Sequence, residues 1–403
     1  MLHWTLALAA CIAAQAPPAE DFLIGYWWGP SEPRQQDFAL VAQANFTVAM
    51  VGGETVQDAT RLLDLCQANG LKALLLVDGD RLMAKSATDP EFHSTIDGVI
   101  RDYAGHPALW GYYIFDEPRH PEQLMQIAAV NQYLLLKDPN HVPFINILPI
   151  HSWQPYEQNV DNYLATAHPR LLSYDKYSLF PNAEAPDHFE NLEVIRREAL
   201  KYDIAFNFVF LVTPSGNYRD PSEADLRWQA YGAIAYGARG IMYYTYVTPP
   251  PDMPAYIGWG EGIAKADGTP SKKYAWVQRI NATVLHWAPT LLRLVSTGVC
   301  HTEPVPQGCV PLTGNEGITR IEGGQFVVGF FTSDQGETYA MLVHRAPRAP
   351  AYDARVVFSR PVRLALVDPA DGQERRAELL DENGLTVWHA LFDPGEGKLV
   401  HIQ

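Results

Sequence analysis

Two adjacent acids, Asp116 and Glu117, end an apolar segment of the chain and are followed by Pro118. The segment, residues 109–115, is rich in aromatic residues and carries no charge, as in a strand that is buried on both faces. Proline cannot continue a central strand, so the strand should end here. Carboxyl groups are costly to bury without a role. The sequence therefore predicts that these two acids do chemistry. The alternative is that Asp116 caps the next helix and Glu117 lies in a solvated loop.

Two further acids, Asp175 and Glu261, are candidates for the same chemistry. Asp175 lies in another apolar segment, and its alternative role is an ion pair with Lys176. Glu261 lies in a loop of glycine and tryptophan residues that could close over a ligand. Hydrolysis of a glycosidic bond needs two carboxyl groups: one protonates the leaving oxygen, and the other attacks the sugar or activates water. We predict Glu117 as the general acid, with Asp116 orienting Glu117, a loop or a sugar hydroxyl. Asp175 or Glu261 is then the second reacting carboxylate.

Aromatic side chains gather at the predicted strand ends and in the loops beside them. Aromatic rings commonly line ligand pockets, and the flat C–H faces of sugars pack on them. We therefore predict that they bind a carbohydrate, the alternative being that many of them belong to the core. Asn146 and His151 lie near the end of the fifth predicted strand, and we predict that they bind sugar hydroxyls, although a lone histidine is often structural. The predicted aromatic binding residues are Trp27, Trp28, Tyr113, Trp153, Tyr177, Tyr244, Tyr246 and Trp259.

These candidates need a scaffold that brings distant strand ends together. Eight apolar segments, each ended by its own turn residues, alternate with helix patterns over residues 21–292. This count predicts an α/β protein with a (β/α)8 TIM barrel, in which the carboxyl-terminal strand ends carry the active site. A doubly wound sheet is the alternative, but no glycine-rich dinucleotide turn follows the first segment. The predicted strands are 22–28, 45–51, 71–77, 109–117, 142–148, 171–177, 204–212 and 240–247.

After about residue 292 the pattern changes to short alternating segments with no long helix. Turn pairs such as Asp371-Gly372 and Asn383-Gly384 separate these segments. We therefore predict a small, all-β antiparallel sandwich domain over residues 293–403. Cys300 and Cys309 lie nine residues apart within it, and in an exported protein they are a disulfide candidate.

A barrel strand that ends in Asp116-Glu117-Pro resembles the Asn-Glu-Pro end of the fourth strand in the clan A glycoside hydrolases, which often carry a C-terminal sandwich. The resemblance implies hydrolysis of O-glycosidic bonds with Glu117 as acid/base. The sequence departs from the clan in two ways. Asp116 replaces the asparagine, and segment 204–212 contains no acid where the clan has its nucleophilic glutamate. The second carboxylate therefore does not follow from the resemblance, and a non-catalytic carbohydrate-binding barrel is the alternative function.

Charge and termini limit the partners and the location of the protein. The formal net charge of −16 argues against nucleic acid and anionic membrane surfaces, which need a basic face, but not against a carbohydrate. Residues 1–20 include an apolar run too short to span a bilayer, which predicts export. Either a cut after Ala16 or a lipid on Cys11 fits, giving a periplasmic, extracellular or bacterial surface-anchored protein. No cofactor is expected, and no Cys/His spacing suggests a zinc site.

Overall fold

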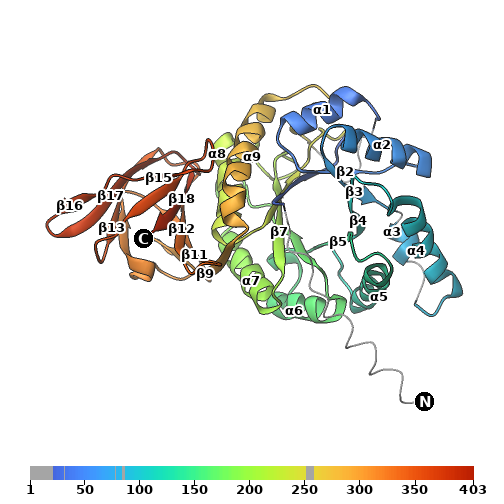
Figure 1. Cartoon of the computed structure of the whole chain (residues 1–403), viewed down its shortest axis with the longest axis horizontal. Helices are drawn as coiled ribbons and strands as arrows, with labels where there is room; N and C mark the ends of the chain where they lie inside the picture. Colours follow the sequence, from blue (N-terminus) through green and yellow to red (C-terminus); the bar gives the residue numbers. More distant parts are fainter. Residues whose placement is uncertain (1–20, 31, 78, 84–86, 251–257) are drawn as a thin grey trace, which may run out of the picture.

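The computed structural model describes residues 21–30, 32–77, 79–83, 87–250 and 258–403, and the predicted leader at 1–20 lies outside this range. The described chain has two parts, a ring of strands surrounded by helices and a smaller β domain beside it (Figure 1). Among the helices of the described residues, none is both long enough and apolar enough to span a membrane.

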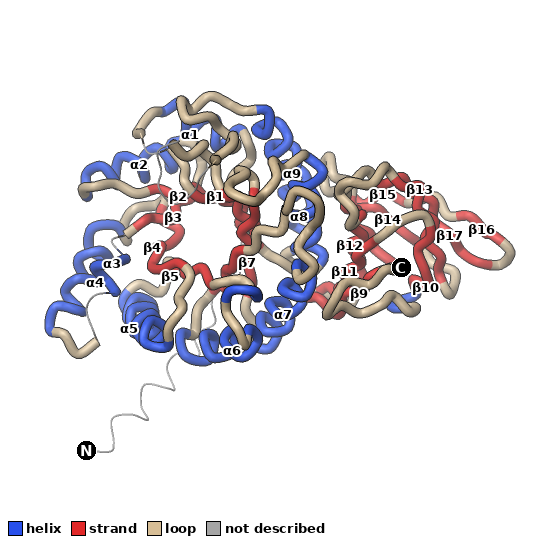
Figure 2. Tube along the Cα trace, turned by 180° about the vertical axis from the view of Figure 1, so that it is seen from behind, coloured by secondary structure: helices blue, strands red, loops and turns tan. Residues whose placement is uncertain are grey.

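Eight parallel strands form the barrel, and the helices surround it (Figure 2). The strand order is β1-β8-β7-β6-β5-β4-β3-β2, and the backbone N–H of Thr47 bonds to the carbonyl of Ile24 at 2.9 Å, joining β1 to the start of β2. Each strand lies within its predicted segment, which confirms the fold class. The strands are β1 (Leu23–Trp27), β2 (Val48–Val51), β3 (Lys72–Leu76), β4 (Leu109–Asp116), β5 (Val142–Ile147), β6 (Leu171–Asp175), β7 (Ala205–Leu211) and β8 (Gly240–Tyr244).

Local sequence signals begin several of the surrounding helices. Thr55, Ser222 and Ser271 each accept a hydrogen bond from a backbone N–H in the first turn of the helix that follows. The helices are α1 (Gln35–Gln43), α2 (Val56–Ala68), α3 (Gly79–Met83), α4 (Pro90–Tyr103), α5 (Pro121–Lys137), α6 (Tyr156–Ala167), α7 (His188–Lys201), α8 (Glu223–Ala235) and α9 (Lys272–Leu291), with short 3-10 helices η1 (Ile150–Ser152) and η2 (Asn315–Gly317).

Two antiparallel sheets follow α9, as predicted for an all-β domain. The six-stranded sheet has the order β15-β14-β18-β12-β11-β9, and the four-stranded sheet has the order β10-β13-β17-β16. The strands are β9 (Leu294–His301), β10 (Ile318–Glu322), β11 (Phe326–Ser333), β12 (Thr338–His344), β13 (Tyr352–Phe358), β14 (Leu364–Val367), β15 (Glu374–Arg376), β16 (Leu380–Glu382), β17 (Leu385–Phe392) and β18 (Gly397–Ile402).

The six-stranded sheet packs directly on α8 of the barrel, and Trp287 of α9 donates a hydrogen bond of 2.9 Å to the carbonyl of Val367 in this sheet (Figures 1 and 2). Phe331, Met341 and Leu399 of this sheet belong to the same buried cluster as the barrel side chains. At the closest approach, Gly329 lies against α8, where any added Cβ would overlap the carbonyl oxygen of Ala235. The barrel and the C-terminal domain therefore share one continuous core.

Cys300 and Cys309 are both free thiols, so the predicted disulfide is wrong. The reason is that the two side chains pack into different places. Cys300 lies on β9 in the core between the two C-terminal sheets. Cys309 packs against the barrel side, where its Sγ lies 3.7 Å from the hydroxyl of Tyr236.

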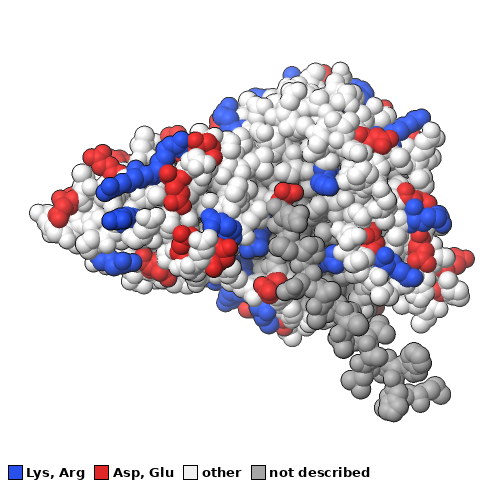
Figure 3. Space-filling model, in the orientation of Figure 1, with Lys and Arg blue, Asp and Glu red and all other residues white. Residues whose placement is uncertain are grey.

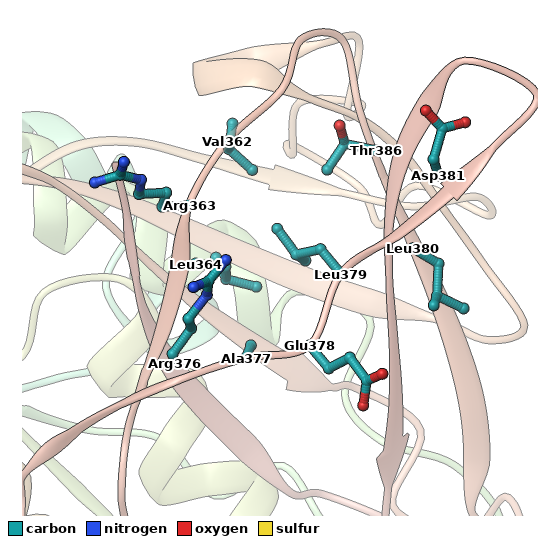
Figure 4. Close-up of a pocket in the computed structure, with 10 residues that line it drawn as sticks. All are labelled: Val362, Arg363, Leu364, Arg376, Ala377, Glu378, Leu379, Leu380, Asp381 and Thr386. Atoms are coloured by element: carbon teal, nitrogen blue, oxygen red, sulfur yellow. The ribbon is translucent and has the colours of Figure 1, made fainter.

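The surface shows no continuous basic region on the face seen in Figure 3, where Lys and Arg lie among Asp and Glu. A cavity of about 520 Å³ lies in the C-terminal domain (Figure 4). Its lining, residues 362–364, 376–381 and 386, has charges of both signs and no aromatic ring. It comes entirely from the C-terminal domain and is separate from the acids predicted to do chemistry.

Candidate active site

Two of the predicted acids meet through one amide. Asp116 ends β4 and Asp175 ends β6, and Asn146 of the intervening β5 lies between them. The Asn146 Nδ2 atom lies 2.8 Å from Asp175 Oδ1 and 3.3 Å from Asp116 Oδ1. Since one nitrogen reaches both carboxyl groups, they lie close together at the carboxyl-terminal end of the barrel strands.

The orientation of this amide is fixed by a chain of buried side chains across three strands. Asn146 Oδ1 accepts a hydrogen bond of 2.9 Å from the Ser173 hydroxyl, which in turn accepts one of 3.0 Å from Asn207 Nδ2 on β7. With its oxygen bonded to a donor, Asn146 must present its N–H groups to the carboxyl groups. Sequence reasoning missed Ser173 and Asn207, although a polar residue inside an otherwise apolar strand was the available signal.

Glu117 leaves the strand in an unusual conformation. Its φ of 47° is left-handed, which is rare for glutamate, and its N–H bonds to the Asn146 carbonyl at 2.8 Å. A register shift between Tyr113 and Phe115 also interrupts the regular alternation along β4. The side chain is 33% exposed, and its carboxylate pairs with Arg119 at 2.6 Å. This ion pair engages the carboxyl group that sequence reasoning predicted as the general acid.

The two acids held by Asn146 bind protons more tightly than usual. Burial raises the pKa of Asp175 well above its ordinary value, and the charges of Glu117 and Asp116 raise it further, against the hydrogen bond from Asn146. Burial and the Glu117 charge raise the pKa of Asp116 to about 7. Asp116 remains exposed to solvent, but the protein around it limits its hydration. Asp116 and Asp175 thus favour their protonated forms more strongly than an ordinary aspartate does.

Glu261 is not part of this cluster. Its side chain is exposed, and its charge acts on Lys272 and Lys273 at the start of α9. Its backbone carbonyl accepts a hydrogen bond of 2.7 Å from Lys273 Nζ. Among the predicted acids, the structure therefore associates Asp116, Glu117 and Asp175 and leaves Glu261 apart.

Six of the predicted aromatic residues form one connected network. The Trp27 ring lies 5.5 Å from Tyr113 and 6.4 Å from Tyr244, measured between centroids. The Tyr244 ring lies 5.1 Å from Tyr177. Trp28 and Trp259 complete the network, since their rings lie 5.8 Å apart and each packs near Tyr244. A wall of rings thus joins the ends of β1, β4, β6 and β8.

Two predicted aromatic residues lie outside this network. Tyr246 is buried and packs against Tyr26 at 4.8 Å and Phe46 at 5.7 Å. Trp153 is also buried, and its carbonyl accepts a hydrogen bond from Asn159 at 3.2 Å. Conversely, the network extends to Tyr218, whose ring lies 5.9 Å from Tyr177 and which sequence reasoning missed because it lies in a loop.

His151 of η1 lies beside Lys176, the residue that follows Asp175. Lys176 Nζ is 3.0 Å from His151 Nδ1 and 2.7 Å from Asp187, so the lysine pairs with Asp187 rather than with Asp175. Within the part of the chain that the structure describes, no group of three or more His, Cys, Asp or Glu side chains could hold a metal ion.

No protein-family model matches this sequence, and no characterised protein is found as a relative. Solved structures do match the fold. A glycoside hydrolase family 5 protein from Bacteroides vulgatus has a TM-score of 0.57 at 11% identity, covering 94% of this chain and 88% of its own. A GH27 β-L-arabinopyranosidase from Geobacillus stearothermophilus has a TM-score of 0.56 at 9% identity, covering 96% and 97%.

A β-galactosidase from Marinomonas has a TM-score of 0.52 at 11% identity, and it covers 68% of this chain. This chain spans only 62% of that enzyme. The two matches above cover both chains almost completely, so they include the C-terminal β domain as well as the barrel. The chain therefore has the fold of the glycoside hydrolase barrels that it was predicted to resemble.

Proposed function

We propose that this protein is a glycoside hydrolase that cleaves O-glycosidic bonds of an oligo- or polysaccharide. The observation that carries the proposal is the meeting of Asp116 of β4 and Asp175 of β6 at the amide of Asn146. Glu117 follows β4 directly, and its charge raises the pKa of the buried Asp175. The aromatic network at the neighbouring strand ends supports a carbohydrate ligand. The fold shared with glycoside hydrolases supports the same class of reaction.

The protonation of the cluster suggests a role for each acid. Asp175 gives its proton to the leaving oxygen as the bond between that oxygen and the anomeric carbon breaks. Glu117 either attacks the anomeric carbon or takes a proton from the attacking water. After direct attack, water hydrolyses the bond between Glu117 and the sugar, supplies the new hydroxyl and gives its other proton to Asp175. When Glu117 activates water instead, it holds that proton, which returns to Asp175 through solvent before the next cycle. This assignment reverses the role predicted for Glu117, because its carboxylate lies 2.6 Å from the Arg119 guanidinium, whereas burial favours the proton on Asp175.

Variants that keep the shape of each acid test the assignment. We expect Glu117→Gln and Asp175→Asn each to lower kcat/KM on unactivated glycosides by about 10²–10⁴-fold. With an aryl glycoside whose leaving group needs no proton, Asp175→Asn should recover much of the loss and Glu117→Gln should not. Glu261→Gln, outside the cluster, is the matched control. If Glu117→Gln recovers activity on the aryl glycoside instead, Glu117 is the general acid. The anomeric configuration of the first product then distinguishes direct attack, which retains the configuration of the substrate, from water activation, which inverts it.

A non-catalytic carbohydrate-binding barrel is the second candidate function. It is favoured by β7, whose described side chains include Asn207 but no acid. In that case the purified protein should bind glycans without turnover, and Glu117→Gln should leave the affinity unchanged. Turnover of any glycoside that is lost in Glu117→Gln would exclude this function.

We also propose that the protein is exported, on the basis of the apolar run in residues 6–14. Cell fractionation and mass spectrometry of the mature N-terminus would test this. A lipid-modified Cys11, abolished by Cys11→Ser, would indicate a surface anchor, whereas a start at residue 17 would indicate release. An unprocessed N-terminus in the cytoplasmic fraction would contradict export.

A further inference from the structure

We infer that Lys176 is a positioning residue that fixes His151 in its Nε2–H tautomer, so that the imidazole presents a neutral N–H donor to a hydroxyl of the bound sugar. The sugar as the acceptor rests on the proposed function. The tautomer itself does not, because it follows from contacts within this chain.

The first step is the geometry around the lysine. The Lys176 side chain is only 2% exposed, and its Nζ lies 2.7 Å from Asp187 Oδ1 and 3.0 Å from His151 Nδ1. The ion pair with Asp187 favours the charged ammonium, against the burial that lowers the pKa of Lys176. An ammonium group has three donors and no acceptor, so the nitrogen facing it must be unprotonated. Nδ1 of His151 therefore accepts, and the ring proton lies on Nε2.

The second step is the charge state of the ring. Burial and the Lys176 cation lower the pKa of His151, while the charges of Asp187, directly before α7, and Glu117, directly after β4, oppose this. A doubly protonated ring would also bring a second donor against the ammonium. The neutral ring is thus the form that the contacts favour near neutral pH.

The third step is the location of the donor. His151 belongs to η1, directly after β5, and the residue is exposed. Its Nε2 has no hydrogen-bond partner in the described part of the chain. The ring lies 3.0 Å from Lys176, the residue that follows Asp175 of the carboxyl cluster. A neutral N–H at this point suits an uncharged hydroxyl or ring oxygen, and it adds no positive charge that would compete with Arg119 for Glu117.

The wild-type protein alone tests the tautomer. Two-bond ¹H–¹⁵N spectra of the full chain labelled with ¹⁵N-histidine should show His151, identified by its absence in His151→Gln, in the Nε2–H form near neutral pH. In Lys176→Met the signal should change to a mixture of tautomers, and the titration midpoint of His151 should rise, because a nearby cation is lost. Lys201→Met, which removes an exposed lysine paired with Asp161, is the matched control and should change nothing at His151.

An Nδ1–H tautomer in the wild type, or an unchanged His151 signal in folded Lys176→Met, would overturn the inference. If Lys176→Met fails to fold, the tautomer of the wild-type His151 decides the inference on its own.

Kinetics then separate this inference from the proposed function. With a glycoside that is turned over, His151→Gln, whose amide N–H replaces Nε2–H, should keep more activity than His151→Asn, whose shorter amide lies near the Nδ1 position. An Nε2–H signal without turnover of any glycoside would defeat the proposed function and leave the tautomer standing. Turnover of a glycoside by a protein whose His151 is in the Nδ1–H form would contradict this inference and leave the proposed function standing.

Discussion

The side-chain amide of Asn146 donates a hydrogen bond of 2.8 Å to Asp175. Because the donor favours the ionised form of the acid, this bond lowers a pKa that burial and neighbouring charges raise. Asn146 acts on Asp116 in the same direction. One buried amide thus limits how strongly both acids hold their protons. The pKa of Asp175 is raised by the charge of Asp116 and lowered by the hydrogen bond from Asn146, so removing each neighbour should move it in the opposite direction.

The pH at which activity is lost on the alkaline side (the alkaline limb) should move when either neighbour of Asp175, Asp116 or Asn146, is replaced. If Asp175 is the proton donor, activity falls as the pH rises through its pKa. Asp116→Asn removes a negative charge that raises this pKa, so the limb should move to lower pH. Asn146→Ala removes the donor that lowers the pKa, so the limb should move to higher pH. Profiles of kcat/KM against pH measure both, and shifts in the same direction would contradict the assignment of Asp175.

Stability should depend on pH through Asp116. Its folded pKa is about 7, above the ordinary value of 3.8, so the folded state holds a proton that the unfolded state has lost between these values. The unfolding free energy therefore falls as the pH rises across this window and stays lowered above it. Asp116→Asn removes the effect. We expect the variant to gain in Tm relative to the wild type at pH 8 but not at pH 3.5, and an equal difference at both pH values would contradict the raised pKa.

The eight barrel strands could be predicted because each apolar run ends at its own glycine, proline or acid. The closeness of Asp116 and Asp175 also followed in outline, since the carboxyl ends of barrel strands meet at one face. The ion pair of Glu117 with Arg119 could not be predicted, because it accompanies a left-handed backbone conformation at Glu117 that the sequence does not indicate. No sequence pattern indicated Asp187, directly before α7, as the partner of Lys176.

Binding should depend on the aromatic network. Trp259 packs near Trp28 and Tyr244 at centroid distances of 5.8 and 6.1 Å, so its ring would form part of a sugar-binding wall. Burial of one large apolar side chain contributes about 1.5–3 kcal/mol, and about 1.4 kcal/mol corresponds to tenfold in Kd. We expect Trp259→Ala to raise the Kd for a bound glycan at least ~10-fold by calorimetry. Trp276→Ala, on α9 and outside the network, should leave the Kd unchanged; equal losses in both variants would indicate general destabilisation.

The shared core predicts that the two domains depend on each other for stability through Gly329. This residue of β11 lies so close to the carbonyl of Ala235 in α8 that a methyl group must push the sheet and the helix apart. Overpacking of this kind costs about 1–3 kcal/mol, so Gly329→Ala should lower the midpoint of urea unfolding.

Gly298 in the neighbouring β9 is the matched control, because a Cβ there would meet nothing within 4 Å. Gly298→Ala should be neutral or slightly stabilising, since alanine restricts the unfolded chain. If both variants unfold at the wild-type midpoint, the close packing of β11 on α8 is wrong. If only Gly329→Ala is destabilised, its barrel should also unfold at lower urea, which near-ultraviolet circular dichroism of the barrel tryptophans would detect.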